Sequence, residues 1–140
     1  YGDYECSYCA LAHPIVNQVQ AYFGDRLRLI YRNFPLREAH PHAELAAEAA
    51  EIAAKYGKFW EMHDLIYQNN NNLSKELFIE LARRLGLPVE ELKDVFAIKP
   101  YQPKIRGDFQ GGVISGVNGT PTFFINGYRY NGAPEVDELI

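Results

Sequence analysis

The chain has 140 residues, of which 47% are hydrophobic and 23% are charged, and its formal net charge at pH 7 is −4. These values are typical of one globular domain with a core that needs no disulfide staples. The sequence has no basic patch of the size that nucleic acid requires and no apolar run long enough to span a membrane. We therefore expect a single domain over residues 1–140, without a nucleic-acid partner or a transmembrane segment.

The chain opens with a short segment, residues 1–5, that looks like the end of a strand and the loop after it. A helix follows, because apolar side chains recur at helical spacing at Cys9, Ala12, Val16, Val19 and Phe23. Pro14 lies inside this helix and should kink it, and Gly24 should end it. Residues that favour β-structure then predict a strand over residues 27–34.

The remainder of the chain is mostly helical in pattern. Apolar spacing predicts four helices within residues 40–99, the third of them capped by Ser74. The elements expected after this block are a weaker, glycine-containing helix over 101–117, a strand over 122–125, a turn at Asn126-Gly127, a strand over 128–130 and a helix over 134–140.

One strand is missing from this order. A helix that packs on a sheet usually lies between two strands, with a right-handed crossover, and here the first helix has only the second strand. We therefore expect the native gene to encode an apolar strand just upstream of Tyr1.

The two cysteines of the chain stand in Cys6-Ser7-Tyr8-Cys9, at the start of the first helix. Two thiols at this spacing can close a disulfide and open it again. The motif alone fits a redox dithiol, half of a zinc site or a fixed structural disulfide. Such a motif suits a reducing and an oxidising compartment alike, so the composition leaves the compartment open.

Three stretches together resemble the DsbA family of thiol-disulfide oxidoreductases, including the short DsbA-like domains fused to NhaA-type sodium/proton antiporters. They are residues 3–9 around the cysteines, residues 57–63 and the Gly-Thr-Pro-Thr segment within 116–127, and Pro14 also matches. The resemblance spans essentially the whole chain. It implies an α/β, thioredoxin-like fold with an all-helical insertion at about residues 37–100 and with the first strand missing from this chain.

The resemblance also assigns the redox residues. Cys6 lies where the unpaired N–H groups and the dipole of a helix favour a thiolate, so we expect it to be the nucleophile and the more exposed thiol. Cys9 is the expected resolving thiol. Pro121 is expected to form a cis peptide bond beside the two thiols, and Thr120 to offer its backbone to an extended substrate. A plain turn proline is the alternative for Pro121.

Other residues leave alternatives open. Tyr4 and Tyr8 fit an apolar rim for substrate, or equally ordinary half-buried tyrosines. His13 could join Cys6 and Cys9 in a zinc site, but no further cysteine completes it, and we expect no metal and no cofactor. The histidines of the helical block are expected to be exposed at a helix start, for His40 and His42, or at a helix surface or packed, for His63.

The residues around Cys6 also bear on its redox potential. The family's intervening histidine is replaced by Ser7 and Tyr8, which carry no positive charge, while Asp3 and Glu5 add negative charge that disfavours a thiolate. We therefore expect a potential between about −120 mV for DsbA and about −270 mV for thioredoxin, and a Cys6 pKa above the ~3.5 of DsbA.

The function that follows is a thiol-disulfide oxidoreductase that exchanges disulfides with protein substrates and is recycled by a redox partner. A redox-sensing or regulatory domain attached to a membrane transporter is the alternative. The resemblance implies the bacterial periplasm or another extracytoplasmic site, and it leaves the cytoplasm open.

Overall fold

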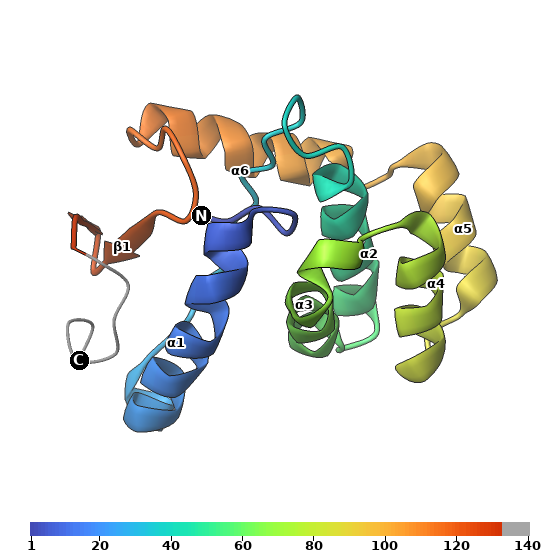
Figure 1. Ribbon diagram of the computed structural model, residues 1–140, viewed down its shortest axis with the longest axis horizontal. Helices are drawn as coiled ribbons and strands as arrows, with labels where there is room; N and C mark the ends of the chain where they lie inside the picture. Colours follow the sequence, from blue (N-terminus) through green and yellow to red (C-terminus); the bar gives the residue numbers. More distant parts are fainter. Residues whose placement is uncertain (133–140) are drawn as a thin grey trace.

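The computed structural model describes residues 1–132, and helices dominate this part of the chain (Figure 1). The predicted helices are confirmed, apart from the one at 134–140, which lies outside the described residues. The elements, in chain order, are α1 Ser7–Phe23, η1 Gly24–Arg26, α2 Ala43–Lys55, α3 Phe59–Gln68, η2 Asn70–Asn72, α4 Lys75–Arg84, α5 Val89–Ile98, α6 Gln102–Ile114, β1 Phe123–Ile125 and β2 Tyr128–Tyr130.

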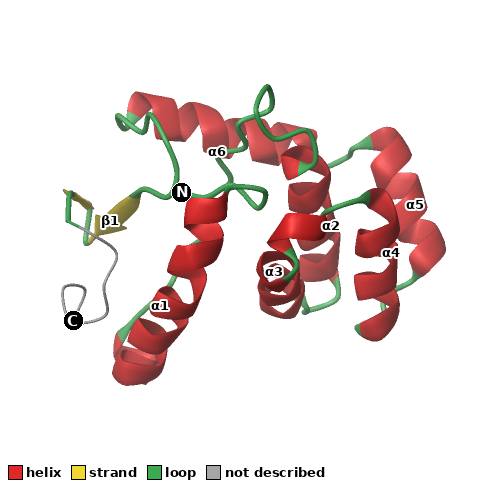
Figure 2. Cartoon of the chain, viewed as in Figure 1, coloured by secondary structure: helices red, strands yellow, loops and turns green. Residues whose placement is uncertain are grey.

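The two strands form an antiparallel hairpin around the predicted Asn126-Gly127 turn, as Figure 2 shows. Both turn residues have positive φ, 51° at Asn126 and 85° at Gly127, which is why this dipeptide suits the position. Within the described residues, this hairpin is the whole regular sheet.

The prediction of a strand over residues 27–34 is wrong, because this segment forms no regular strand. This segment makes a single parallel bridge, between Gly2 and Asn33, in which Gly2 donates to Arg32 O at 3.0 Å and Phe34 donates to Gly2 O at 2.8 Å. A regular strand forms hydrogen bonds with a neighbouring strand along its whole length, whereas this segment pairs with the described chain at one residue, Gly2. β-propensity alone could not reveal that limit.

Residues 1 and 2 connect this segment to the C-terminal part of the fold. The Tyr1 ammonium donates to Thr122 O at 2.9 Å, and Thr122 N donates to Tyr1 O at 3.1 Å. Gly2 then pairs with the 27–34 segment, through its bridge to Asn33. The start of the described chain is therefore held between two segments that are distant in sequence, immediately before the two cysteines.

Helix α2 forms the middle of the core and contacts α3, α4, α5 and α6. Its inner face consists mainly of alanine, which lets the surrounding helices approach closely and bring larger side chains such as Met62, Ile66, Phe78 and Leu81 into the same core. Ser74 caps α4 by accepting a hydrogen bond from Leu77 N at 3.1 Å, as predicted.

Helix α6 lies against the 27–34 segment through a glycine. A Cβ on Gly112 would stand 2.7 Å from the ring of Phe34, which stacks on Phe109 with 4.3 Å between ring centroids. Gly107, one turn or more earlier in the same helix, has open space at the corresponding point. Gly112 is one of the glycines predicted to weaken this helix, and the close approach of Phe34 explains why a glycine stands there.

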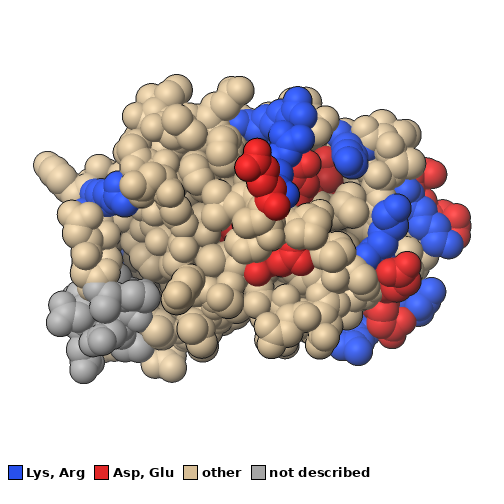
Figure 3. All heavy atoms as spheres, turned by 45° about the horizontal axis from the view of Figure 1, so that its top comes forward, with Lys and Arg blue, Asp and Glu red and all other residues tan. Residues whose placement is uncertain are grey.

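Charged side chains gather toward the side of the molecule where α4 and α5 lie, and a broad uncharged area lies away from them in this view (Figure 3). Within the helices the charges form short-range pairs, such as Glu80 with Arg83 at 2.7 Å. Among the described residues, no helix is both long enough and apolar enough to cross a membrane.

Candidate functional site

The two thiols lie at the first turn of α1. Cys6 is the N-cap residue, with extended backbone angles, and Cys9 lies within the first turn, on the buried face. Both are free thiols. Cys6 is 5% exposed and Cys9 is 4% exposed, so the expected difference in exposure is absent.

The electrostatics of the two thiols differ strongly despite their equal burial. A hydrogen bond from the Cys9 side chain lowers the pKa of Cys6 to about 5, against the opposing effect of burial. The Thr120 side chain and the backbone amides of Cys9 and Tyr8 act in the same direction as Cys9. The hydrogen bond to Cys6, followed by burial, raises the pKa of Cys9. Cys6 is therefore the thiol that ionises first, in line with its expected role as nucleophile.

The Thr120–Pro121 peptide bond is cis, as predicted, and it lies beside Cys6. The Cys6 Sγ donates to the Thr120 carbonyl oxygen at 3.7 Å, across 114 positions of sequence. Thr122 Oγ1 donates to Gly119 O at 2.7 Å, which fixes the turn. The structure thus brings together Cys6, Cys9, Thr120 and Pro121, which the sequence predicted to meet.

The loop before Cys6 is anchored by the buried carboxylate of Asp3. One of its oxygens accepts from Glu5 N at 2.8 Å, and the other accepts from Leu36 N at 2.8 Å and lies 2.7 Å from His40 Nδ1. Burial opposes the charged form of His40, but the hydrogen bond and the charge of Asp3 raise the pKa of His40 overall. The prediction that His40 is exposed at a helix start is therefore wrong, because its side chain is 24% exposed and paired with Asp3.

A second pair lies beside the first. Glu5 accepts from the backbone N of His42 at 2.8 Å, and its other oxygen lies 2.8 Å from His42 Nδ1. Asn70 Nδ2 donates to Tyr4 O at 2.7 Å and to Cys6 O at 3.4 Å. The two acidic residues before Cys6 are thus paired with histidines, and the expected effect of their negative charge on the thiolate did not include these contacts. The sequence gives no signal of these contacts, because the partners are 37 or more positions apart.

The two candidate rim tyrosines have different environments. Tyr8 is 70% exposed and stands next to the thiols, as a rim residue should. Tyr4 is 1% exposed, and its hydroxyl is hydrogen-bonded to His63 Nδ1 at 2.8 Å. The placement of Tyr4 at a rim is therefore wrong, because its ring packs in the core with the rings of Tyr31 and Tyr67.

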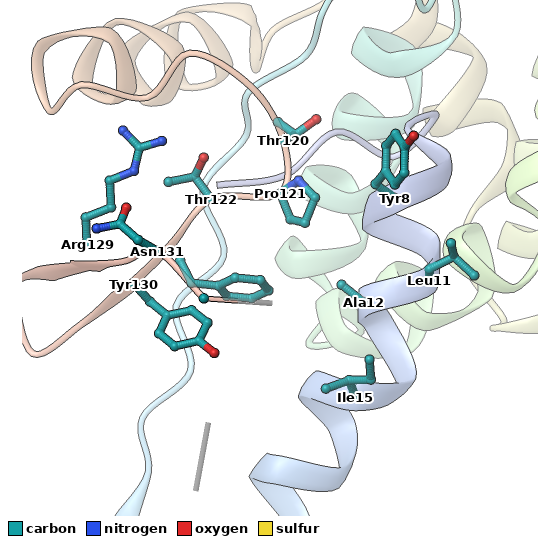
Figure 4. A pocket seen from close by; sticks show the side chains of 12 residues that line it. Tyr8, Leu11, Ala12, Ile15, Thr120, Pro121, Thr122, Arg129, Tyr130 and Asn131 are labelled. Carbon is teal, nitrogen blue, oxygen red and sulfur yellow. The ribbon is translucent and has the colours of Figure 1, made fainter. Parts of the chain in front are cut away.

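A groove of about 420 Å³ lies between the α1 side chains from Tyr8 to Ile15 and the chain around Pro121. Figure 4 shows Tyr8, Leu11 and Ile15 on the helix side and Thr120 and Pro121 on the other side. Leu11 is 68% exposed and Tyr8 is 70% exposed, so the helix side of the groove presents adjacent apolar side chains to solvent.

His13 does not join the cysteines in the cluster that the sequence raised as a possible zinc site. Its Nε2 lies 3.2 Å from Asp64 Oδ1 and 3.3 Å from Asn17 Nδ2. Among the described residues, the group with metal-ligand spacing combines His13 with His63 and Asp64. His63 is buried rather than on a helix surface, and burial lowers its pKa to about 3.

Comparisons with known proteins agree with this geometry. Residues 1–140 match the protein family described as Thioredoxin. The chain is similar to a solved structure, a thioredoxin-like oxidoreductase from Silicibacter pomeroyi DSS-3, with 26% sequence identity, a TM-score of 0.81 and coverage of 98% of this chain and 78% of that chain.

Curated relatives carry the same domain as a part of longer proteins. The chain is 40% identical over 139 residues to "Na(+)/H(+) antiporter NhaA 1" of Salinispora arenicola and 38% identical over 133 residues to "Na(+)/H(+) antiporter NhaA" of Herminiimonas arsenicoxydans. These matches cover 99% and 95% of this chain but 21% of each relative, so the chain spans about a fifth of their length. On its family match and its fold, which combines a small two-stranded sheet with a helical insertion, the chain belongs to the thioredoxin family.

Proposed function

We propose that this chain is a thiol-disulfide oxidoreductase that acts on protein substrates, with Cys6 as nucleophile and Cys9 as resolving thiol. The observation that carries the proposal is the pairing of the two thiols at the start of α1, which lowers the pKa of Cys6 to about 5 beside the Thr120 carbonyl. At neutral pH such a thiol is mostly thiolate, which is the attacking species in disulfide exchange.

The exchange proceeds in two balanced steps. In the reducing direction, the Cys6 thiolate attacks one sulfur of a substrate disulfide, a mixed disulfide forms and the other substrate sulfur leaves as a thiolate. Cys9 then loses its proton and attacks the Cys6 sulfur, which releases the second substrate thiolate and leaves a Cys6–Cys9 disulfide. The substrate gains two electrons and the protein loses two. A dithiol recycling partner restores the reduced form, and the oxidising direction is the reverse of these steps.

The groove next to the thiols supports an extended peptide as the substrate. Tyr8, Leu11 and Ile15 offer apolar contacts on one side, and the segment at Thr120 offers backbone groups on the other. A peptide in this position would pair with Thr120 as an edge strand does, and its cysteine would then lie near Cys6. Tyr8→Ala should raise KM for a peptide disulfide with little change in kcat, and it should leave exchange with glutathione unaffected. If Tyr8→Ala slowed exchange with the peptide and with glutathione equally, the groove would not be the peptide-binding site.

Variants of the two cysteines test the roles directly. Cys6→Ser should abolish insulin reduction, whereas Cys9→Ser should accumulate a mixed disulfide with substrate because the resolving step is lost. Ser7→Ala, which keeps both thiols, serves as the control. If Cys6→Ser traps substrate and Cys9→Ser does not, the assigned roles are reversed. If neither wild type nor Ser7→Ala reduces insulin or oxidises a peptide dithiol, the chain is not an oxidoreductase of proteins.

A second function is a redox-sensing domain attached to a membrane transporter, and the size of the curated relatives favours it. Those relatives are named as antiporters, and the chain matches a fifth of their length. A sensor would form a reversible Cys6–Cys9 disulfide in glutathione buffers without turnover of protein substrates. For either activity we propose an extracytoplasmic location because of the resemblance to the DsbA family, while the dithiol itself suits an oxidising and a reducing compartment alike.

A further inference from the structure

A cluster of metal-ligand side chains lies between α1 and α3, one helical turn beyond Cys9. It comprises His13 from α1 with His63 and Asp64 from α3, and the three potential ligand atoms all lie within 4.8 Å of one another. His13 Nε2 and Asp64 Oδ1 are already 3.2 Å apart. Neutral imidazole and carboxylate are ligands that divalent transition metals prefer.

The surroundings hold His63 in the way that a metal-binding histidine is usually held. Its Nδ1 lies 2.8 Å from the Tyr4 hydroxyl, and in the tautomer with the proton on Nδ1 this nitrogen donates to Tyr4 and leaves Nε2 free as the ligand atom. Protein ligands of metals commonly have the second ring nitrogen fixed by such an outer partner, because that contact sets the orientation of the ring. His63 is 6% exposed and His13 is 8% exposed, so both rings are confined by packing.

A fourth ligand is also at hand. Asn17 lies on the same face of α1 as His13, one turn later, with its amide 3.3 Å from His13 Nε2. Rotation of that amide presents its oxygen in place of its nitrogen. The Asp64 side chain is 42% exposed, so an ion and a water molecule can reach the cluster from solvent.

We propose that His13, His63 and Asp64 form a binding site for one Zn²⁺, with Asn17 or a water molecule as the fourth ligand. Bonds of about 2.0–2.2 Å in a tetrahedral site place ligand atoms about 3.4 Å apart, so separations that lie within 4.8 Å must close by at most roughly 1.4 Å. Side-chain rotation of the half-exposed Asp64 supplies part of this movement. The bound ion would tie the helix that carries the thiols to the helical insertion.

The test must separate this site from the thiols, because a reduced dithiol binds Zn²⁺ by itself. We would titrate the Cys6→Ser/Cys9→Ser double variant, and in parallel the oxidised wild-type chain, with Zn²⁺ by calorimetry. One ion per chain should bind in both preparations. In the double variant, His13→Gln and Asp64→Asn should each weaken binding at least tenfold, while His42→Gln, which changes a histidine outside the cluster, should leave it unchanged.

Three results would overturn the proposal: no saturable binding in either thiol-free preparation, equal affinity after Asp64→Asn, or an equal loss after His42→Gln. Circular dichroism verifies that each variant is folded. Because the Asp64 side chain is half-exposed, Asp64→Asn decides the question even if His13→Gln fails to fold. The absorption of bound Co²⁺ then distinguishes a tetrahedral site from loose surface binding. The thiols are absent or oxidised throughout, so the result is independent of the redox function.

Discussion

Replacing Cys9 by alanine and by serine should have different effects on the pKa of Cys6. The hydrogen bond from the Cys9 side chain is the largest cause of the low Cys6 pKa, which is about 5. Alanine removes the donor, whereas serine keeps a hydroxyl at nearly the same place. A hydrogen bond to a charged group contributes about 1.5–3 kcal/mol, and each pKa unit corresponds to about 1.36 kcal/mol. Cys9→Ala should therefore raise the Cys6 pKa by about 1–2 units, and Cys9→Ser by less than half of that.

The rate of alkylation by iodoacetamide as a function of pH reports the Cys6 thiolate in both variants, because Cys6 is then the one remaining thiol. The ultraviolet absorbance of the thiolate gives an independent measurement. Circular dichroism controls for changes in α1. If the pKa of Cys6 is the same in Cys9→Ala and Cys9→Ser, the Cys9 thiol is not the main donor to Cys6. The backbone amides at the start of the helix would then have to account for the low pKa.

The same pKa makes the stability of the reduced chain depend on pH. The pKa of Cys6 falls from 9.0 to about 5 on folding, so the thiolate stabilises the folded state fully above pH 9, and this stabilisation is lost as pH falls toward 5. Between pH 5 and pH 7 the change is roughly 2 kcal/mol. The free energy of unfolding of the reduced wild type and of Cys6→Ser can be measured with urea at each pH. Its difference between the two proteins should grow by that amount from pH 5 to pH 7. A constant difference over this range would contradict the assigned pKa.

Two further predictions concern contacts that support the site. Asp3→Asn should destabilise the chain by about 1–3 kcal/mol in urea unfolding and lower the pKa of His40 measured by NMR, since the carboxylate that raises it is gone; an unchanged pKa would refute the pairing. Gly112→Ala should cost about 1–3 kcal/mol because its Cβ meets Phe34, whereas Gly107→Ala should be neutral or stabilise by up to about 1 kcal/mol. Similar values for the two glycines would contradict the packing of α6.

Local patterns in the sequence were enough to predict most helices and the hairpin. The apolar spacing of α2 to α5, the Ser74 cap and the Asn126-Gly127 turn each depend on residues a few positions apart, and the structure confirms them. The meeting of Cys6 with Thr120 spans 114 positions and was accessible through the resemblance of both motifs to one family. Helical periodicity alone would not have joined them.

Features that depend on distant partners were not predictable in the same way. The 27–34 segment has the composition of a strand, but its pairing depends on a neighbour that a local pattern cannot supply. Tyr4 lies close to the cysteines in the sequence, which suggested a place at the rim, but its side chain packs against Tyr31 and His63. His40 lies just before a helix and looked exposed, yet the buried carboxylate of Asp3, from the loop before α1 and 37 positions away, engages it.

The helical insertion supplies much of the support for the loop at residues 3–6, so it is part of the proposed redox site. His40 and His42, from the loop that leads into α2, engage the two carboxylates before Cys6. Asn70, in the turn after α3, donates to two backbone carbonyls of the loop, and the Tyr67 hydroxyl donates to a third at 3.5 Å. A short loop with a bend before a helix has few backbone partners of its own, and buried carbonyls without partners are costly. A change in the insertion that moves α3 would therefore shift the position of Cys6 relative to Thr120, and with it the reactivity of the thiol.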